Sequence, residues 1–214
     1  MNDYFALVWE FFIFIDNSLL LTFNGLSNPV MDAVMPVVSM RTVWIPLYLL
    51  LFCLVWRRYG WKGAVLCLLT VLLAVAAADQ LCGSFLRGLI GRLRPSNPDN
   101  PVSRWVNIVN DYRGGKYGFP SCHAANTAAV AMLLSLWLKR RGMTAFLFSW
   151  AGLVSLSRIY LGVHYPGDVL LGFSIGAGIA YALWRLMLYG LRHARRTSSR
   201  LGLHILPQLQ NSGL

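Results

Sequence analysis

Three short stretches of this chain carry the residue types that phosphoryl transfer requires. They read Arg87-x6-Arg94-Pro95, Pro120-Ser121-Cys122-His123 and Ser157-Arg158-x5-His164-x3-Asp168, in a chain with only four histidines and eight acidic residues. Guanidinium groups bind phosphate oxygens through paired N–H donors. One imidazole can act as a nucleophile, another as an acid, and a carboxylate can orient the first. These stretches therefore predict a site that transfers or hydrolyses a phosphate group.

His164 and Asp168 flank the turn Tyr165-Pro166-Gly167. Proline suits the first turn of a helix because it has no N–H to lose, so we expect His164 just before a helix and Asp168 in its first turn. From there the carboxylate can accept a hydrogen bond from one imidazole nitrogen and leave the other nitrogen basic. The pair is predicted to be a nucleophile with its orienting group. The alternative is a structural histidine–aspartate cap.

Pro120-Ser121-Cys122-His123 opens an apolar stretch that is typical of a helix. A helix N-terminus presents unpaired backbone N–H groups and the positive end of the helix dipole, which suit an anion. Ser121 is predicted to donate its hydroxyl to a phosphate oxygen, with simple helix capping as the alternative. An imidazole pKa near about 6.5 suits His123 for proton transfer, whereas a lone histidine in an apolar helix is more often a packed core residue.

The three stretches, in this order, resemble the motifs of the type 2 phosphatidic acid phosphatase family in its bacterial form. These are membrane lipid phosphatases related to vanadium haloperoxidases. The resemblance implies that His164 attacks phosphorus to give a phosphohistidine and that His123 protonates the leaving oxygen. It also implies metal-independent chemistry without a cofactor, and the chain has no acidic cluster suited to a divalent metal. The phosphate-binding positions that it implies are Arg87, Arg94, Ser121, Cys122 and Arg158.

Two positions depart from the family pattern. Arg87 stands where lysine is usual, which keeps the charge but changes the geometry, and Arg92 is an alternative contributor. Cys122 stands where glycine is usual, so a Cβ and a sulfur occupy space near the phosphate; a redox role for this thiol is a minor alternative. Lys116, in a glycine-rich approach to the serine motif, is predicted together with Arg92 to contact the substrate headgroup.

The composition indicates a membrane protein. Hydrophobic residues make up 57% of the 214 residues, charged residues 13%, and the mean hydropathy is +0.54, whereas soluble domains carry about 25% charged residues. The net charge of +11 gathers in clusters at 57–62, 139–141 and 192–200 that contain no acidic residue. Because these clusters lie between or after apolar runs, they indicate cytoplasmic loops and argue against a nucleic-acid partner. The four cysteines lack metal-ligand spacing, and we expect no disulfide framework.

Six apolar segments are predicted to be helices, at about 4–23, 42–56, 63–86, 121–138, 143–163 and 167–189. The expected fold is an all-α, polytopic membrane protein with about six transmembrane helices in one bundle. Residues 1–190 form a single phosphatase domain and 191–214 a basic cytoplasmic tail. The first segment carries two acidic residues, so it either spans the bilayer or lies in its interface. Asp79, inside the third segment, is predicted to make an interhelical hydrogen bond.

The order of these segments places the chemistry at one membrane face. If every segment spans, loop 87–120 and turn 158–167 lie on the side opposite the basic clusters. The positive-inside rule then makes the site extracytoplasmic, in the inner membrane of a bacterium with the site facing the periplasm. No cleavable signal peptide is expected.

The leading functional prediction is an integral membrane enzyme that removes a phosphate or pyrophosphate from a lipid. The candidate substrates are undecaprenyl pyrophosphate, lipid A phosphate, phosphatidylglycerophosphate and phosphatidic acid, and the lipid bilayer is the surrounding partner. A non-catalytic lipid-phosphate binder or carrier is the main alternative, although binding alone needs only the cations. A vanadate-dependent peroxidase and a nucleic-acid binder are less favoured, and the oligomeric state stays open.

Overall fold

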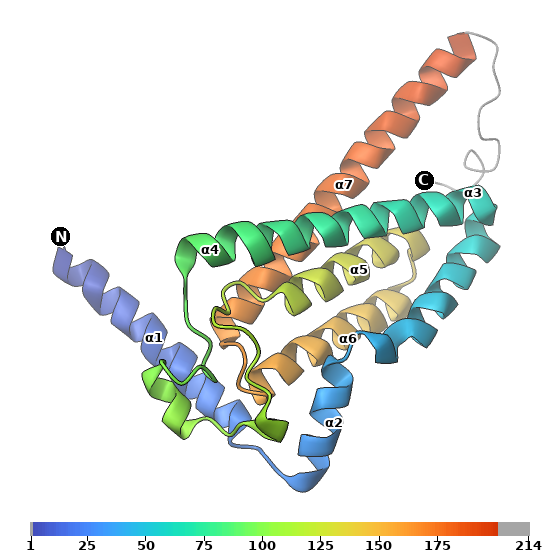
Figure 1. Ribbon diagram of the computed structural model, residues 1–214. Coiled ribbons are helices and arrows are strands. Elements are labelled where there is room, and N and C mark those ends of the chain that lie inside the picture. The colour runs from blue at the N-terminus through green and yellow to red at the C-terminus, as the bar shows by residue number, and fades with distance from the viewer. Residues whose placement is uncertain (1, 201–214) are drawn as a thin grey trace.

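The computed structural model describes residues 2–200, which fold almost entirely into helices (Figure 1). No β-strand occurs in this range; one isolated antiparallel bridge joins Leu93 to Tyr117. The main helices are α1 (Asn2–Asn24), α2 (Pro29–Ser39), α3 (Ile45–Asp79), α5 (Cys122–Leu138), α6 (Arg141–Tyr160) and α7 (Pro166–Arg200). A π-helix (Gln80–Leu86) continues α3 into the short α4 (Arg87–Ile90), and 3-10 turns lie at Thr42–Trp44, Pro101–Trp105 and Val109–Asp111.

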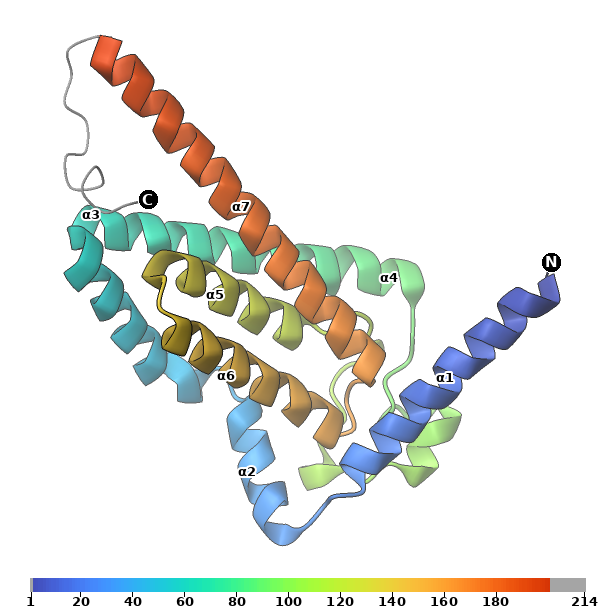
Figure 2. The same cartoon turned by 180° about the vertical axis from the view of Figure 1, so that it is seen from behind.

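Helix α5 forms the centre of the bundle, with α3, α6 and α7 around it (Figures 1 and 2). Small residues let α7 approach closely: a Cβ at Gly172 would lie 2.4 Å from the Ser121 carbonyl oxygen, and one at Gly176 would lie 1.9 Å from that of Ala125. Glycines four residues apart form such a face in membrane helices. The spacing therefore sets the distance between the helices that carry the predicted site.

Helix α3 bends at Gly60, where φ is 70°, a conformation that glycine adopts without strain. The two arms on either side of the bend correspond to the second and third predicted segments. The Arg58 guanidinium donates a hydrogen bond to the Leu138 carbonyl oxygen, and the Tyr59 hydroxyl donates one to the Trp137 carbonyl oxygen. The bend therefore lies beside the α5–α6 turn, so that two of the basic clusters meet at one end of the bundle.

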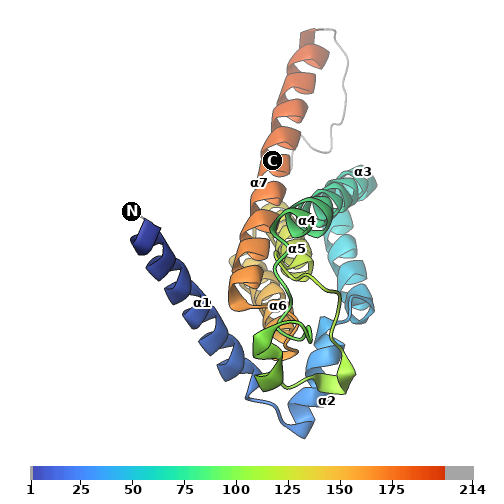
Figure 3. The same ribbon diagram turned by 60° about the vertical axis from the view of Figure 1, so that its left-hand side comes forward.

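Three helices are long and apolar enough to cross a membrane, within the described residues: Thr42–Ile90, Arg141–Tyr160 and Pro166–Ala194. Helix α5 is shorter but also apolar. With the bend in α3, each of the six predicted segments is a helix, which confirms the all-α membrane fold. The N-terminal half of α1 stands apart from the other helices (Figure 3).

Helix α2 lies between the first two predicted segments, where the sequence predicts no helix. Its start has a local cause: the Asn28 side chain accepts a hydrogen bond from the Met31 N–H, and Pro29 occupies the first turn, where proline is favoured. Helix α7 also runs beyond residue 189 into the predicted tail, as far as Arg200. The rest of that tail lies outside the described residues, and the division at residue 190 stays a prediction.

Candidate active site

The three predicted stretches converge at the end of the bundle opposite the Gly60 bend (Figure 1). The first comes from α4 and the loop after it, the second from the start of α5, and the third from the end of α6 and the start of α7. The Ser121 N–H donates to the Asp168 carbonyl oxygen at 2.9 Å and so joins the starts of α5 and α7. One face of the protein therefore holds all three stretches.

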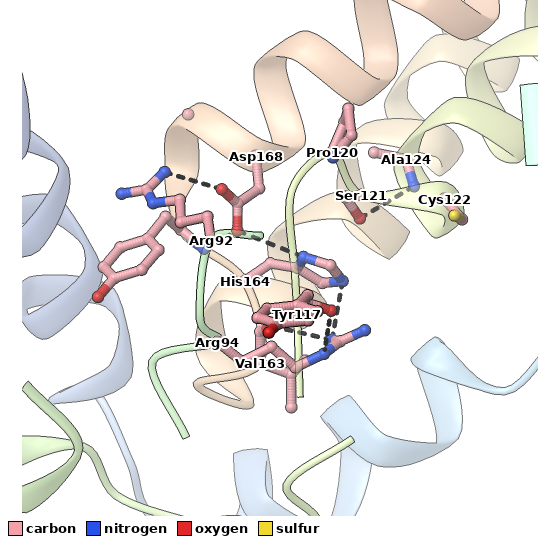
Figure 4. Close-up of polar contacts among 12 residues, drawn as sticks. Arg92, Arg94, Tyr117, Pro120, Ser121, Cys122, Ala124, Val163, His164 and Asp168 are labelled. Atoms are coloured by element: carbon pink, nitrogen blue, oxygen red, sulfur yellow. Dashed lines mark hydrogen bonds and ion pairs between the residues drawn. The ribbon is translucent and has the colours of Figure 1, made fainter. Parts of the chain in front are cut away.

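His164 and Asp168 form a buried pair (Figure 4). The imidazole Nδ1 lies 3.5 Å from the Asp168 Oδ2, a distance too long for a good hydrogen bond. Oδ2 accepts instead from the Tyr165 N–H at 3.0 Å. Because catalytic hydrogen bonds often shorten only when substrate binds, this arrangement can orient the imidazole, with its Nδ1–H toward the carboxylate and Nε2 unprotonated.

Arg94 covers the other side of the imidazole. Its Nη1 lies 3.0 Å from His164 Nε2 and donates to the Val163 carbonyl at 2.9 Å. Burial, and then the neighbouring Arg158, lowers the pKa of Arg94 to about 10, so this guanidinium stays charged at neutral pH. Burial, and then Arg94, holds the pKa of His164 well below its usual value. The folded protein therefore disfavours the protonated form of this ring, which lies beside a guanidinium suited to binding an anion.

Arg87 and Arg158 present further guanidinium nitrogens to the same region. Arg87 Nη2 donates to Cys122 Sγ at 3.0 Å and to the Pro120 carbonyl at 3.4 Å. Arg158, 3% exposed, donates to the Ser39 hydroxyl and, at 3.2 Å, to the Tyr112 hydroxyl. The Nε atoms of both arginines are buried without a hydrogen-bond partner. Buried donors without partners are costly, and an anion would satisfy them.

Ser121 and His123 lie at the start of α5. Ser121 is fully buried, and its hydroxyl oxygen accepts from the Ala124 N–H at 3.5 Å, so the serine caps the helix. His123 is only half-buried and lines two connected cavities. One, of about 490 Å³, lies over Arg158 and Tyr112.

The second cavity, of about 330 Å³, extends between the two arms of α3, α5 and α6. Its walls are largely apolar and include Tyr48, Phe52, Leu68, Val71, Val130 and Leu134. Ser39, Arg41 and His123 belong to both cavities. His123 therefore stands where a charged space meets an apolar one.

Arg92 and Lys116 have partners of their own. Arg92 makes ion pairs with Asp168 at 2.8 Å and with Asp16 at 2.5 Å, so it contacts the carboxylate predicted to orient His164. Lys116 is 58% exposed and lies 3.9 Å from the Asp99 carboxylate. The structure thus places Arg92 against Asp168 and Lys116 on the surface of the loop.

Several residues of this region were missed by sequence reasoning. Asp16 and Arg41 lie far from the motifs in sequence, and Tyr112 carries no motif signal. Only the rule that an ionisable residue in an apolar helix is functional would have drawn attention to Asp16. The same rule was applied to Asp79, whose Oδ1 accepts from the Asn126 side chain at 3.0 Å. This contact confirms the predicted interhelical hydrogen bond.

Within residues 2–200, no group of three or more histidine, cysteine, aspartate and glutamate side chains is arranged to hold a metal ion. The site combines guanidinium groups with two imidazoles and one carboxylate, and guanidinium groups are suited to a phosphate anion. The described cysteines are free thiols.

Apolar helices thus enclose an imidazole among arginines, a site suited to a phosphate group at a membrane. Comparison with known proteins gives the family: the model of the PAP2 superfamily matches residues 64–192. The chain belongs to this superfamily, which confirms the resemblance found in its motifs.

The relatives of this chain are named as phosphatases. A lipid A 4'-phosphatase of Bacteroides thetaiotaomicron is 44% identical over 78% of this chain and 74% of its own length. An undecaprenyl-diphosphatase of Sulfolobus acidocaldarius is 31% identical over 80% of this chain and 74% of its own length. The chain is therefore an enzyme, a phosphatase of the membrane.

Solved structures show the same fold. A transmembrane PAP2-type phosphatidylglycerolphosphate phosphatase of Bacillus subtilis superposes with a TM-score of 0.63 at 22% identity, over 82% of this chain and 85% of the other. LpxE of Aquifex aeolicus gives a TM-score of 0.59 at 23% identity, over 78% of this chain and 93% of the LpxE chain.

Proposed function

We propose that this protein hydrolyses the phosphate ester of a membrane lipid through a phosphohistidine on His164, without a metal ion. The observation that carries the proposal is the neutral, buried imidazole held between the Asp168 carboxylate and the Arg94 guanidinium. A carboxylate on one nitrogen raises the basicity of the other. A cation beside that other nitrogen brings the phosphate to it.

The reaction proceeds in two displacements. His164 Nε2 attacks phosphorus, the bond from phosphorus to the lipid oxygen breaks, and His123 gives its proton to that oxygen. His123 then takes a proton from water, whose oxygen attacks the phosphohistidine. The phosphorus–nitrogen bond breaks, and inorganic phosphate leaves. Arg87, Arg94 and Arg158 stabilise the charge on the phosphoryl oxygens throughout.

The two cavities fit a lipid that reacts at its headgroup. The charged space lined by Arg41 and Arg158 is suited to an anionic headgroup beside the phosphate held at His164, and the apolar space between the arms of α3 is suited to hydrocarbon chains. His123 stands at their junction, which is where the oxygen between phosphate and lipid would lie. Arg41, shared by both cavities, is suited to contact a further anionic group of the headgroup.

A lipid A-type phosphomonoester is the substrate that we propose first, and undecaprenyl pyrophosphate second. Two relatives named lipid A 4'-phosphatase support this order: the one from Bacteroides thetaiotaomicron and one from Porphyromonas gingivalis, 31% identical over 84% of this chain and 76% of its own length. The basic clusters at the opposite end of the bundle support a site that faces the periplasm from the inner membrane.

The decisive experiment measures phosphate release by purified protein in detergent with EDTA present. The panel holds lipid A, undecaprenyl pyrophosphate, phosphatidylglycerophosphate and phosphatidic acid. His164→Ala should abolish release and His123→Ala should lower it severely, whereas His193→Ala, which alters an exposed histidine far along α7, should not.

Labelled phosphate should be trapped as an acid-labile, base-stable phosphohistidine in the wild type and not in His164→Ala. Release that survives His164→Ala would disprove the assignment of the nucleophile. Activity lost in EDTA and restored by a divalent cation would disprove the metal-free mechanism. Lipid binding without turnover on any substrate would favour a non-catalytic carrier.

A further inference from the structure

Asp16 of α1 contacts the start of α7, immediately beside the catalytic pair. Its Oδ1 accepts from the Gly167 N–H at 2.7 Å, and its Oδ2 lies 2.5 Å from Arg92 Nη2. The Gly167 N–H is one of the unpaired donors of a helix N-terminus. A Cβ at Gly167 would lie 3.0 Å from Asp16 Oδ2, so glycine allows this approach. Asp16 also lies outside residues 64–192, which the family model matches.

Arg92 is shared between two carboxylates. Its Nη1 donates to Asp168 Oδ1 at 2.8 Å while its Nη2 pairs with Asp16, and its guanidinium stacks 3.8 Å above the centre of the Tyr165 ring. Because each carboxylate receives one nitrogen, Arg92 engages only Oδ1 of Asp168. Oδ2 is left for the Tyr165 N–H and for His164. An arginine without a second partner prefers to bind both oxygens of a carboxylate.

We infer that Asp16 is a positioning residue, which holds Arg92 in the orientation that leaves one Asp168 oxygen for the imidazole of His164. This inference rests on the proposed role of His164 as nucleophile. Without the Asp16 carboxylate, Arg92 turns toward both oxygens of Asp168 and draws them from His164 Nδ1. The imidazole then loses orientation and the stabilisation of the positive charge that it gains during attack. Helix α1 in this way contributes a positioning residue to the site.

The inference gives a pH signature that loss of folded protein would not give. The ionisable groups that face His164 are Arg94, Arg158, Arg87, Asp168 and His123. Asp168 is the one anion among these five groups. Drawing its carboxylate away from the imidazole therefore lowers the pKa of His164. Without Asp16, the low-pH limb of kcat that reports His164 should therefore move to lower pH while the plateau falls.

Asp16→Asn is the test variant, because the amide oxygen can still accept from the Gly167 N–H while the charge that holds Arg92 is gone. Glu10→Gln is the matched control, since Glu10 is an exposed carboxylate on the same helix. Loss of the hydrogen-bond partner behind a metal-binding histidine costs about 10- to 100-fold in activity. By the same reasoning we expect kcat to fall by about 10-fold, with KM nearly unchanged. Glu10→Gln should leave both constants as in the wild type.

A double-mutant cycle tests the route of the effect. Asp16→Asn should cost nothing further in an Arg92→Gln background. Gly167→Ala should reproduce the Asp16→Asn effect in milder form, because its methyl group pushes the carboxylate away.

The outcomes separate this inference from the proposed function. A wild type that releases no phosphate from any lipid overturns both. If the wild type releases phosphate, any one of three results overturns the inference alone. These are Asp16→Asn behaving like Glu10→Gln, an Asp16→Asn effect that adds to that of Arg92→Gln, and a low-pH limb of kcat that does not move.

Discussion

The close contact between α5 and α7 should make activity sensitive to one methyl group placed a helical turn away from the predicted phosphate site. In Gly176→Ala the new Cβ would lie 1.9 Å from the Ala125 carbonyl oxygen and 2.7 Å from its Cα. Both are backbone atoms, which no rotamer change can move. Ordinary contact begins at 3.4 Å, so the two helices must separate by about 1.5 Å at this level in a tightly packed interior.

That separation lies one helical turn from Ser121, whose N–H is bonded to the Asp168 carbonyl. A misplacement of about 1 Å can cost about 100-fold in rate, and part of the shift is absorbed along α5. We therefore expect kcat for phosphate release to fall by about 10- to 100-fold. Overpacking costs about 1–3 kcal/mol, so the thermal midpoint should fall as well.

Gly178→Ala is the matched control on the same helix. Nothing lies within 4 Å of its Cβ position and the residue is exposed, so the change adds only the helix propensity of alanine, at most about 1 kcal/mol. Both variants would be assayed for phosphate release and for thermal unfolding in the same detergent. Equal kcat and equal midpoints in the two variants would refute the claim that the α5–α7 spacing sets the site geometry.

Three further predictions concern the site itself. Folding lowers the pKa of His164. The stability linked to its neutral form is therefore complete above about pH 6.5 and declines as pH falls toward the folded-state pKa. The thermal midpoint should drop between about pH 7 and about pH 5.5, and it should drop less steeply in His164→Ala. Arg41→Gln should raise KM for a lipid with a second anionic group and leave kcat unchanged, whereas the same change at exposed Arg104 should alter neither constant. Cys122→Gly removes the sulfur that Arg87 contacts and should retain phosphate release; loss of activity would show that the thiol supports Arg87.

Local signals in the sequence accounted for the helices and for the placement of His164 beside Asp168. Each of these signals acts within a few residues. They are the apolar runs longer than a turn, Pro166 before Asp168, and Ser121 before an apolar stretch, and the helices begin there as predicted. The bend of α3 at 57–62 and the α5–α6 turn at 139–140 also lie together at the end of the bundle away from the motifs, as the expected topology requires.

Contacts between distant residues were beyond such signals. The link from Asp16 to Gly167 joins residues 151 apart, and the pairing of Arg92 with two carboxylates depends on how α1 packs. Arg92 in isolation resembles any other loop arginine. Helix α2 is not predictable from the sequence because its two prolines and short length suggest a loop. Its stability comes from tertiary partners such as Tyr160, whose hydroxyl donates a hydrogen bond to Asp32.

The depth of the cavity between the arms of α3 bears on how the substrate reaches the enzyme. Its lining on the second arm runs from Val75 to Ala64, roughly 16 Å along a helix axis. This is about half of the ~30 Å hydrocarbon core of a bilayer, the thickness of one leaflet. The arms converge at Gly60 and diverge toward the catalytic face (Figure 1).

A lipid entering between them would therefore keep its chains at the depth that they already have in the leaflet. Exposing each methylene to water would cost about 0.8 kcal/mol, and sideways diffusion avoids that cost. The enzyme would then need no energy source and no carrier to extract its substrate. Its rate at low substrate density would follow the two-dimensional concentration of lipid in one leaflet rather than the amount in solution.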